Sequence, residues 1–103
     1  MDERVAVIGA ILEDPTRSQS QFNRIVAEYH DLVRGRMGLP LKDKCMSVIS
    51  ITVVGTMDQI NTMTGRLGNL EGVTVKTATQ EAEAGESLEP GRQRLQWTEI
   101  TLL

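Results

Sequence analysis

The chain has 103 residues, of which 40% are hydrophobic, 3% aromatic and 24% charged, and its formal net charge is −3. This length supports one domain, and the composition predicts an aliphatic core. The low total of Lys and Arg disfavours direct nucleic-acid binding, although a small patch of Arg34, Arg36, Lys42 and Lys44 keeps it open.

The cysteine content and the N-terminal residues indicate where in the cell the protein is located. Cys45 is the sole cysteine, and no basic segment with a following apolar stretch precedes the first predicted strand. We therefore expect a cytoplasmic protein. The apolar run at residues 48–54 is too short to cross a bilayer, as is the one at residues 5–12, so no membrane association is predicted.

The first half of the chain predicts a strand and a helix. Residues 4–12, RVAVIGAIL, are almost continuously apolar, which is typical of a central strand, and Gly9 within them indicates a bulge or a close approach by another backbone. A helix is expected to begin near Ser18 or Ser20 and to end at residues 29–31. Its buried stripe is Phe22, Ile25, Val26 and Tyr29.

The middle of the chain predicts two strands. Residues 32–37 are assigned to a strand, after which Gly38 and Pro40 are expected to break regular structure and residues 42–44 to form a polar loop. Residues 46–54 alternate, and one face of this strand is expected to point toward the helices. That face consists of Ser47, Ile49, Ile51 and Val53.

The next segment carries the clearest local signal. Thr56 and Gln59 have the spacing of a capping box, so a helix over residues 57–67 is predicted, with Gly68 as its stop. Residues 73–77 then alternate as an edge or near-edge strand.

This order of elements predicts an α+β, ferredoxin-like fold, βαββαβ. The first and third strands should lie in the middle of a four-stranded antiparallel sheet, with both helices on one face. The other face would be bare, and we assign Ala6, Ile8, Val48 and Val54 to it. A bare apolar face predicts a homo-oligomer, a dimer or a tetramer, that forms through the sheet.

Residues 79–103 differ in character from the rest. Residues 1–78 hold nine basic and nine acidic side chains, whereas residues 79–103 hold two and five. We predict a domain over residues 1–78 and a disordered or loosely attached tail over residues 79–103. The segment EAEAGESLEPGRQRLQ resembles the conceptual translation of an Alu-type repeat of primate genomes, which indicates a foreign origin; a natural disordered tail is the alternative.

Several motifs carry a resemblance to a known family. They are GRMG followed by a proline, SVIS leading into a strand and a Gly-Thr turn, TGRLG at a helix end, and GVTVK in the last strand. Together with RVAVIGAIL, these motifs carry a resemblance between residues 4–78 and the family of regulators of the iron-only (FeFe) hydrogenase system. The resemblance implies an ACT-like domain, similar to the C-terminal domain of nickel-responsive regulators, and a regulatory or accessory role such as transcriptional regulation. It brings no defined catalytic residues and no cofactor.

The resemblance also implies candidate positions for a small effector. ACT-like domains bind ligands near the loop after the first strand, where this chain has Leu12, Glu13 and Asp14. The loop that begins at Met37 and Gly38 is a second candidate. The alternatives are a purely structural oligomerisation scaffold and a small dimeric enzyme.

The sequence gives little support for a metal-binding site or for acid-base catalysis. One histidine, His30, and one cysteine, Cys45, fall in different predicted elements, so no metal site is predicted. Cys45 is expected to be a partly buried small side chain, where the family would have a small residue such as glycine. Tyr29, His30 and Asp31 are consecutive and point in different directions, so they do not predict an active site, and we expect no enzymatic activity.

Overall fold

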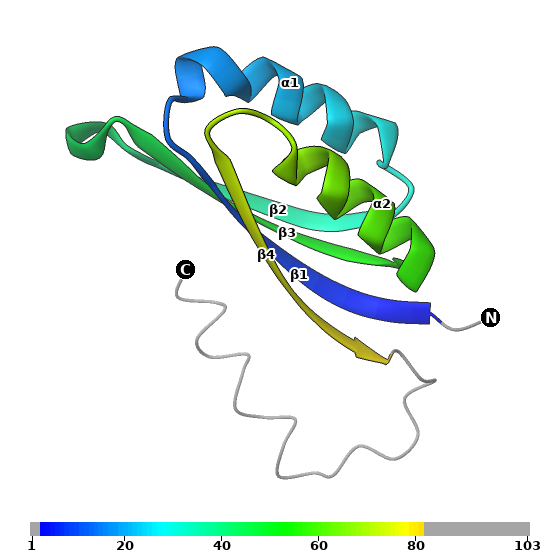
Figure 1. Cartoon of the computed structure of the whole chain (residues 1–103). Coiled ribbons are helices and arrows are strands. Elements are labelled where there is room, and N and C mark those ends of the chain that lie inside the picture. Colours follow the sequence, from blue (N-terminus) through cyan, green and yellow to red (C-terminus); the bar gives the residue numbers. More distant parts are fainter. Residues whose placement is uncertain (1–2, 82–103) are drawn as a thin grey trace, which may run out of the picture.

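The computed structural model describes residues 3–81. In chain order these form β1 (Glu3–Leu12), α1 (Pro15–Glu28), β2 (Val33–Leu41), the short 3₁₀ helix η1 (Lys42–Lys44), β3 (Met46–Thr56), α2 (Met57–Gly68) and β4 (Val73–Glu81). The strands make one antiparallel sheet in the order β2-β3-β1-β4. Both helices lie on one face of it (Figure 1). The predicted α+β, ferredoxin-like fold is confirmed, with β1 and β3 in the middle.

The core lies between the sheet and the two helices. Phe22, Ile25 and Val26 of α1 are buried, as the helical stripe predicts, and α2 contributes a second buried row. That row consists of Ile60, Met63 and Leu67. On β3, Ser47, Ile49, Ile51 and Val53 are buried, as the alternation predicts, and Gly55 continues the same face.

On β1, the predicted assignment of residues to the two faces is wrong. Ala6 and Ile8 are both 0% exposed and belong to the core under the helices, so they cannot lie on the open face. Val7 and Ile11 lie there instead, 48% and 42% exposed. The cause is that an almost continuous apolar run has no alternation from which the phase of a strand can be inferred.

The helix α1 begins earlier than predicted. Pro15 lies in its first turn, where a missing N–H and a fixed φ are tolerated, and Asp14 is the N-cap residue. Ser18, which we expected near the start, is inside the helix, and its hydroxyl donates to the Asp14 carbonyl oxygen at 3.3 Å.

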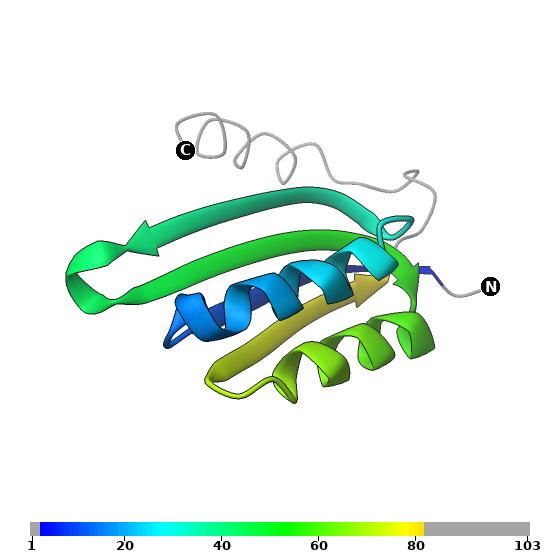
Figure 2. The same cartoon turned by 90° about the horizontal axis from the view of Figure 1, so that it is seen from above.

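The strand β2 continues through two residues that were expected to end it. Gly38 and Pro40 both pair with β3, and the strand ends at Leu41. Because β2 is an edge strand, the missing N–H of a proline is tolerated there. The hairpin of β2 and β3 extends past the helices (Figure 2). At its tip Cys45 has a left-handed φ of 57° and is exposed, which corrects the expected partial burial.

The helix α2 begins as predicted. The Thr56 hydroxyl accepts from the Gln59 backbone N–H at 3.1 Å, and the Gln59 side chain accepts from the Thr56 N–H at 2.9 Å. Gly55 is needed beside this cap, because an added Cβ would lie 2.9 Å from Gln59 Oε1 and 3.0 Å from Leu32 Cδ2.

The last strand is longer than predicted. Residues 79–81 still pair with β1, where Glu81 lies opposite Arg4, so the predicted domain boundary after residue 78 falls inside β4. The predictions for residues 82–103 lie outside the described residues.

Candidate functional site

A hollow of about 350 Å³ lies where the β1–α1 turn meets the α2–β4 turn. The backbone joins these turns, since the Glu13 N–H donates to the Gly72 carbonyl oxygen at 2.8 Å. Gly72 has a φ of 76°, a left-handed conformation that favours glycine. The residues that line the hollow are Glu13, Asp14, Arg17, Gln21, Glu71 and Gly72.

The hollow carries charges of both signs. Three carboxylates face one guanidinium, so its net charge is negative at neutral pH. Arg17 Nη2 lies 3.4 Å from Glu71 Oε1, and the two side chains are 67% and 85% exposed. Such an exposed pair is weak, which leaves Arg17 free to exchange Glu71 for the carboxylate of a ligand.

The hollow contains part of the predicted ligand site. Glu13 and Asp14 line it, whereas Leu12 is 0% exposed and packs in the core. Met37 and Gly38 do not line it: they lie in β2, the edge strand farthest from β4. The structure therefore does not bring the two predicted loops together.

The sequence reasoning missed the other residues of the hollow. Arg17 and Gln21 lie on α1, four residues apart and thus on one helical face, and Glu71 and Gly72 lie in the turn before β4. The signal was available in the topology, because pairing β4 with β1 places that turn beside the β1–α1 turn.

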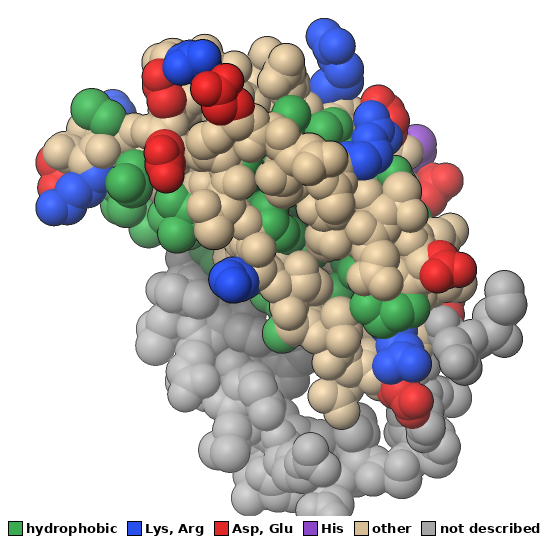
Figure 3. Space-filling view, in the orientation of Figure 1, with side chains coloured by type: hydrophobic (Ala, Val, Ile, Leu, Met, Phe, Trp, Pro, Cys, Tyr) green, Lys and Arg blue, Asp and Glu red, His purple; other side chains and the backbone are tan. Residues whose placement is uncertain are grey.

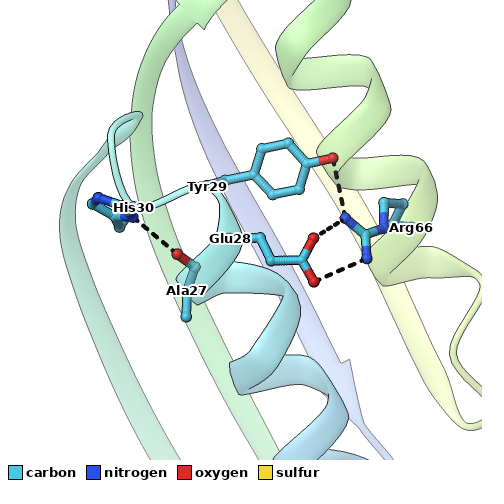
Figure 4. A network of polar contacts seen from close by, with 5 residues as sticks. All are labelled: Ala27, Glu28, Tyr29, His30 and Arg66. Carbon is cyan, nitrogen blue, oxygen red and sulfur yellow. Dashed lines mark hydrogen bonds and ion pairs between the residues drawn. The ribbon is translucent and has the colours of Figure 1, made fainter.

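The side chains of Tyr29 and His30 point away from each other (Figure 4). His30 pairs with its neighbour Asp31 instead, with 3.1 Å between His30 Nε2 and Asp31 Oδ1. The Arg66 guanidinium of α2 donates to the Tyr29 hydroxyl at 3.4 Å, and to the Glu28 carboxylate at 2.5 Å and 3.3 Å. The His30 ring also bonds to the Ala27 carbonyl oxygen at 3.0 Å. The contacts among Glu28, Tyr29 and Arg66 join the two helices, whereas the His30 and Asp31 side chains are 78% and 87% exposed and lie on the open surface.

The ion pair in this cluster shifts two pKa values. The Arg66 guanidinium, chiefly through its hydrogen bonds, lowers the pKa of Glu28 below its ordinary value of 4.5. The same bonds, to Glu28 and then to Tyr29, raise the pKa of Arg66. Both groups are therefore charged throughout the physiological range.

Among residues 3–81 there is no group of three or more His, Cys, Asp or Glu side chains placed to hold a metal ion. Within the same range, neither helix has the length and apolarity needed to span a bilayer.

The second feature of the molecule is the sheet face that the helices leave open. Val48 and Val54 are half-buried there, as predicted, but their role in an interface stays a prediction. Hydrophobic side chains are visible at the hairpin end of the molecule (Figure 3). In the described part of the chain the exposed large apolar residues are Val7, Ile11, Met37, Leu39 and Met46.

The comparisons with known proteins agree with this fold. Residues 4–77 match the family described as "TM1266-like: Iron-only hydrogenase system regulator, putative". The chain belongs to the TM1266-like family. A solved structure, that of the uncharacterized protein TM1266 from Thermotoga maritima, is similar, with a TM-score of 0.72 and 26% sequence identity. The similarity covers 75% of this chain and 96% of that one. No curated protein sequence matches the chain.

Membership in the TM1266-like family confirms the resemblance found in the sequence. The family description supports a regulatory role and points away from an enzyme. The match ends four residues before β4 does, and it contains every residue that lines the hollow.

Proposed function

We propose that this chain is a regulatory module of the iron-only hydrogenase system that acts by binding a small effector and catalyses no reaction. The observation that carries the proposal is the hollow between the β1–α1 and α2–β4 turns. Charged side chains from separate segments converge around this hollow, and Glu13 and Asp14, expected from the family resemblance to bind a ligand, are among them.

The charges of the hollow favour a zwitterionic effector such as a free amino acid. Arg17 suits a ligand carboxylate, because a guanidinium offers paired donors to two oxygens. Glu13 and Asp14 suit a ligand ammonium group. A nucleotide fits poorly, since its phosphates would meet three carboxylates.

The proposal includes that the chain is not an enzyme. Tyr29 is engaged by Arg66, while His30 bonds to the Ala27 carbonyl oxygen and pairs with Asp31 on the exposed surface. A general acid or base must reach the reacting proton within hydrogen-bond distance, and these side chains do not share a space where a substrate could meet both.

A thermal shift and calorimetry series tests the effector. Purified full-length chain is titrated separately with each of a panel of free amino acids and with a panel of nucleotides. We expect at least one amino acid to raise the melting temperature, because a ligand that binds only the folded state stabilises it. We expect the nucleotides to leave it unchanged.

Two matched substitutions locate the site. Asp14→Asn removes a charge from the hollow and keeps a good N-cap residue for α1. Asp43→Asn removes the same charge at the exposed hairpin tip. The first should weaken binding of the amino acid about tenfold or more, a typical effect for a lost ion pair, and the second should not. Equal binding by both variants would contradict the proposed site.

A structural oligomerisation scaffold is the second candidate, and the open apolar face of the sheet favours it. A scaffold needs no effector, so an unchanged melting temperature across both panels would select it. Self-association without any ligand is compatible with both candidates and does not separate them.

A further inference from the structure

We propose that a second copy of this chain packs face to face against the open side of the sheet, centred on Gly9 of β1 and Ser50 of β3. This inference does not depend on the effector hollow. It starts from the exposed large apolar side chains, which are 36–58% exposed and all belong to this one face. They are Val7 and Ile11 on β1, Met37 and Leu39 on β2, and Met46 on β3.

The strand register shows that these side chains form one continuous surface. Residues directly opposite in an antiparallel pair point to the same face. One row across the sheet is Leu39, Val48, Ile11 and Thr74; the next is Met37, Ser50, Gly9 and Lys76; the third is Gly35, Thr52, Val7 and Ala78. The patch thus spans all four strands.

The charge of this surface indicates which kind of partner it can bind. In these three rows Lys76 is the one charged side chain, and it lies on the edge strand β4. A nucleic acid or an anionic lipid surface would need a concentration of Lys and Arg, which these rows lack. An uncharged centre with charge at its margin is typical of the interface between identical subunits.

The size of the face suits a dimer of this chain. Four strands spaced about 4.8 Å apart, each covering about 30 Å, give a footprint of roughly 600 Å² per copy. Two such faces together bury about 1,200 Å², the lower end of the range for specific protein complexes. A two-fold axis lets one patch meet an identical patch, so no second surface is needed.

Gly9 gives the face a depression at its centre and offers a sharp test. It lies between Val7 and Ile11 on the same side of β1, and a Cβ added there would meet its nearest atom, the Lys76 carbonyl oxygen, at 3.8 Å. Within one chain a larger side chain therefore fits. Between two sheets packed about 10 Å apart, the same side chain takes the space of the facing copy.

The matched control is Gly38. It lies in β2 opposite Ile49, which is buried under the helices, so Gly38 points to the other side of the sheet from Gly9. A Cβ there would have no atom within 4 Å. Gly9→Val and Gly38→Val thus make the same change in strands of the same sheet, and valine suits both strands.

Sedimentation equilibrium of the full chain at micromolar concentration measures the result. We expect the wild type and Gly38→Val to have about twice the 11.4 kDa mass of one chain, and Gly9→Val to have the mass of one folded chain. The Gly9→Val variant should melt at a lower temperature than the wild type, because it loses the stabilisation by the second copy. Ser50→Glu is the second variant, and should also give a single chain, because it places a charge in the centre of the interface. Ser20→Glu on exposed α1 is its control.

A wild-type chain that is monomeric under these conditions would overturn the proposal. So would a Gly9→Val or a Ser50→Glu variant that stays folded and associates as strongly as the wild type. If Gly9→Val fails to fold, Ser50→Glu decides the outcome by itself. None of these results depends on whether an amino acid binds in the hollow.

Discussion

At the scale of single residues, the Glu28–Arg66 pair makes stability depend on pH. The folded state lowers the pKa of Glu28 below its ordinary value of 4.5, so the carboxylate stabilises the fold above that pH. This contribution is lost as the pH falls through the lowered pKa. We expect Glu28→Gln to be less stable than the wild type at neutral pH and equally stable once the pH is low enough to protonate Glu28 in the folded state.

Urea unfolding at neutral and acidic pH measures this difference. Arg66→Ala serves as the partner variant, because it removes the cause of the shift. It should lose at least as much stability at neutral pH, since it also removes the hydrogen bond to Tyr29. If the stability difference between Glu28→Gln and the wild type persists where Glu28 is protonated in the folded state, the ion pair is not the source of that difference.

Cys45 has a backbone conformation that suits glycine. Its φ of 57° is left-handed, and a side chain in that region costs about 1–2 kcal/mol. We expect Cys45→Gly to stabilise the chain by up to about 1 kcal/mol, after the entropy that glycine loses on folding. Cys45→Ser keeps the side chain and should leave stability unchanged. The midpoint of denaturant unfolding measures both, and a gain in the serine variant equal to that in the glycine variant would contradict this account.

At the scale of the elements, β1 shows what the sequence does and does not determine. The capping box at Thr56 and Gln59 is a local pattern, and it predicts the start of α2 correctly. The phase of β1 is set by its pairing with β3, where Ile8 lies opposite Ile51, and both are buried under the helices. A run in which nearly every residue is apolar has no signal for this pairing.

Substitutions in β1 test its phase. We expect Ile8→Ala to cost about 2–5 kcal/mol, because it leaves a cavity in the core, whereas Val7→Ala should cost less than about 1 kcal/mol in a monomer. Denaturant unfolding at a concentration low enough to keep the chain monomeric measures both. Similar losses at the two positions would contradict the orientation of β1.

At the scale of the whole molecule, the order of elements was enough to predict the sheet and the side that the helices cover. The order of elements could not predict the exact site, because the hollow depends on contacts between turns that are far apart in the sequence. Glu13 and Asp14 were found through a family resemblance, while Glu71 needed the pairing of β4 with β1. The extent of β2 was missed because Gly38 and Pro40 are typical of turns, although an edge strand such as β2 tolerates a proline.

The proposed function is tested most directly by hydrogenase output in cells that carry this gene and an iron-only hydrogenase. The gene is deleted and then restored as the wild type, Asp14→Asn or Asp43→Asn. A regulator that works through the hollow predicts that deletion changes hydrogenase activity, and that the wild type and Asp43→Asn restore it while Asp14→Asn does not. Hydrogenase activity that is the same with and without the gene would contradict the proposal.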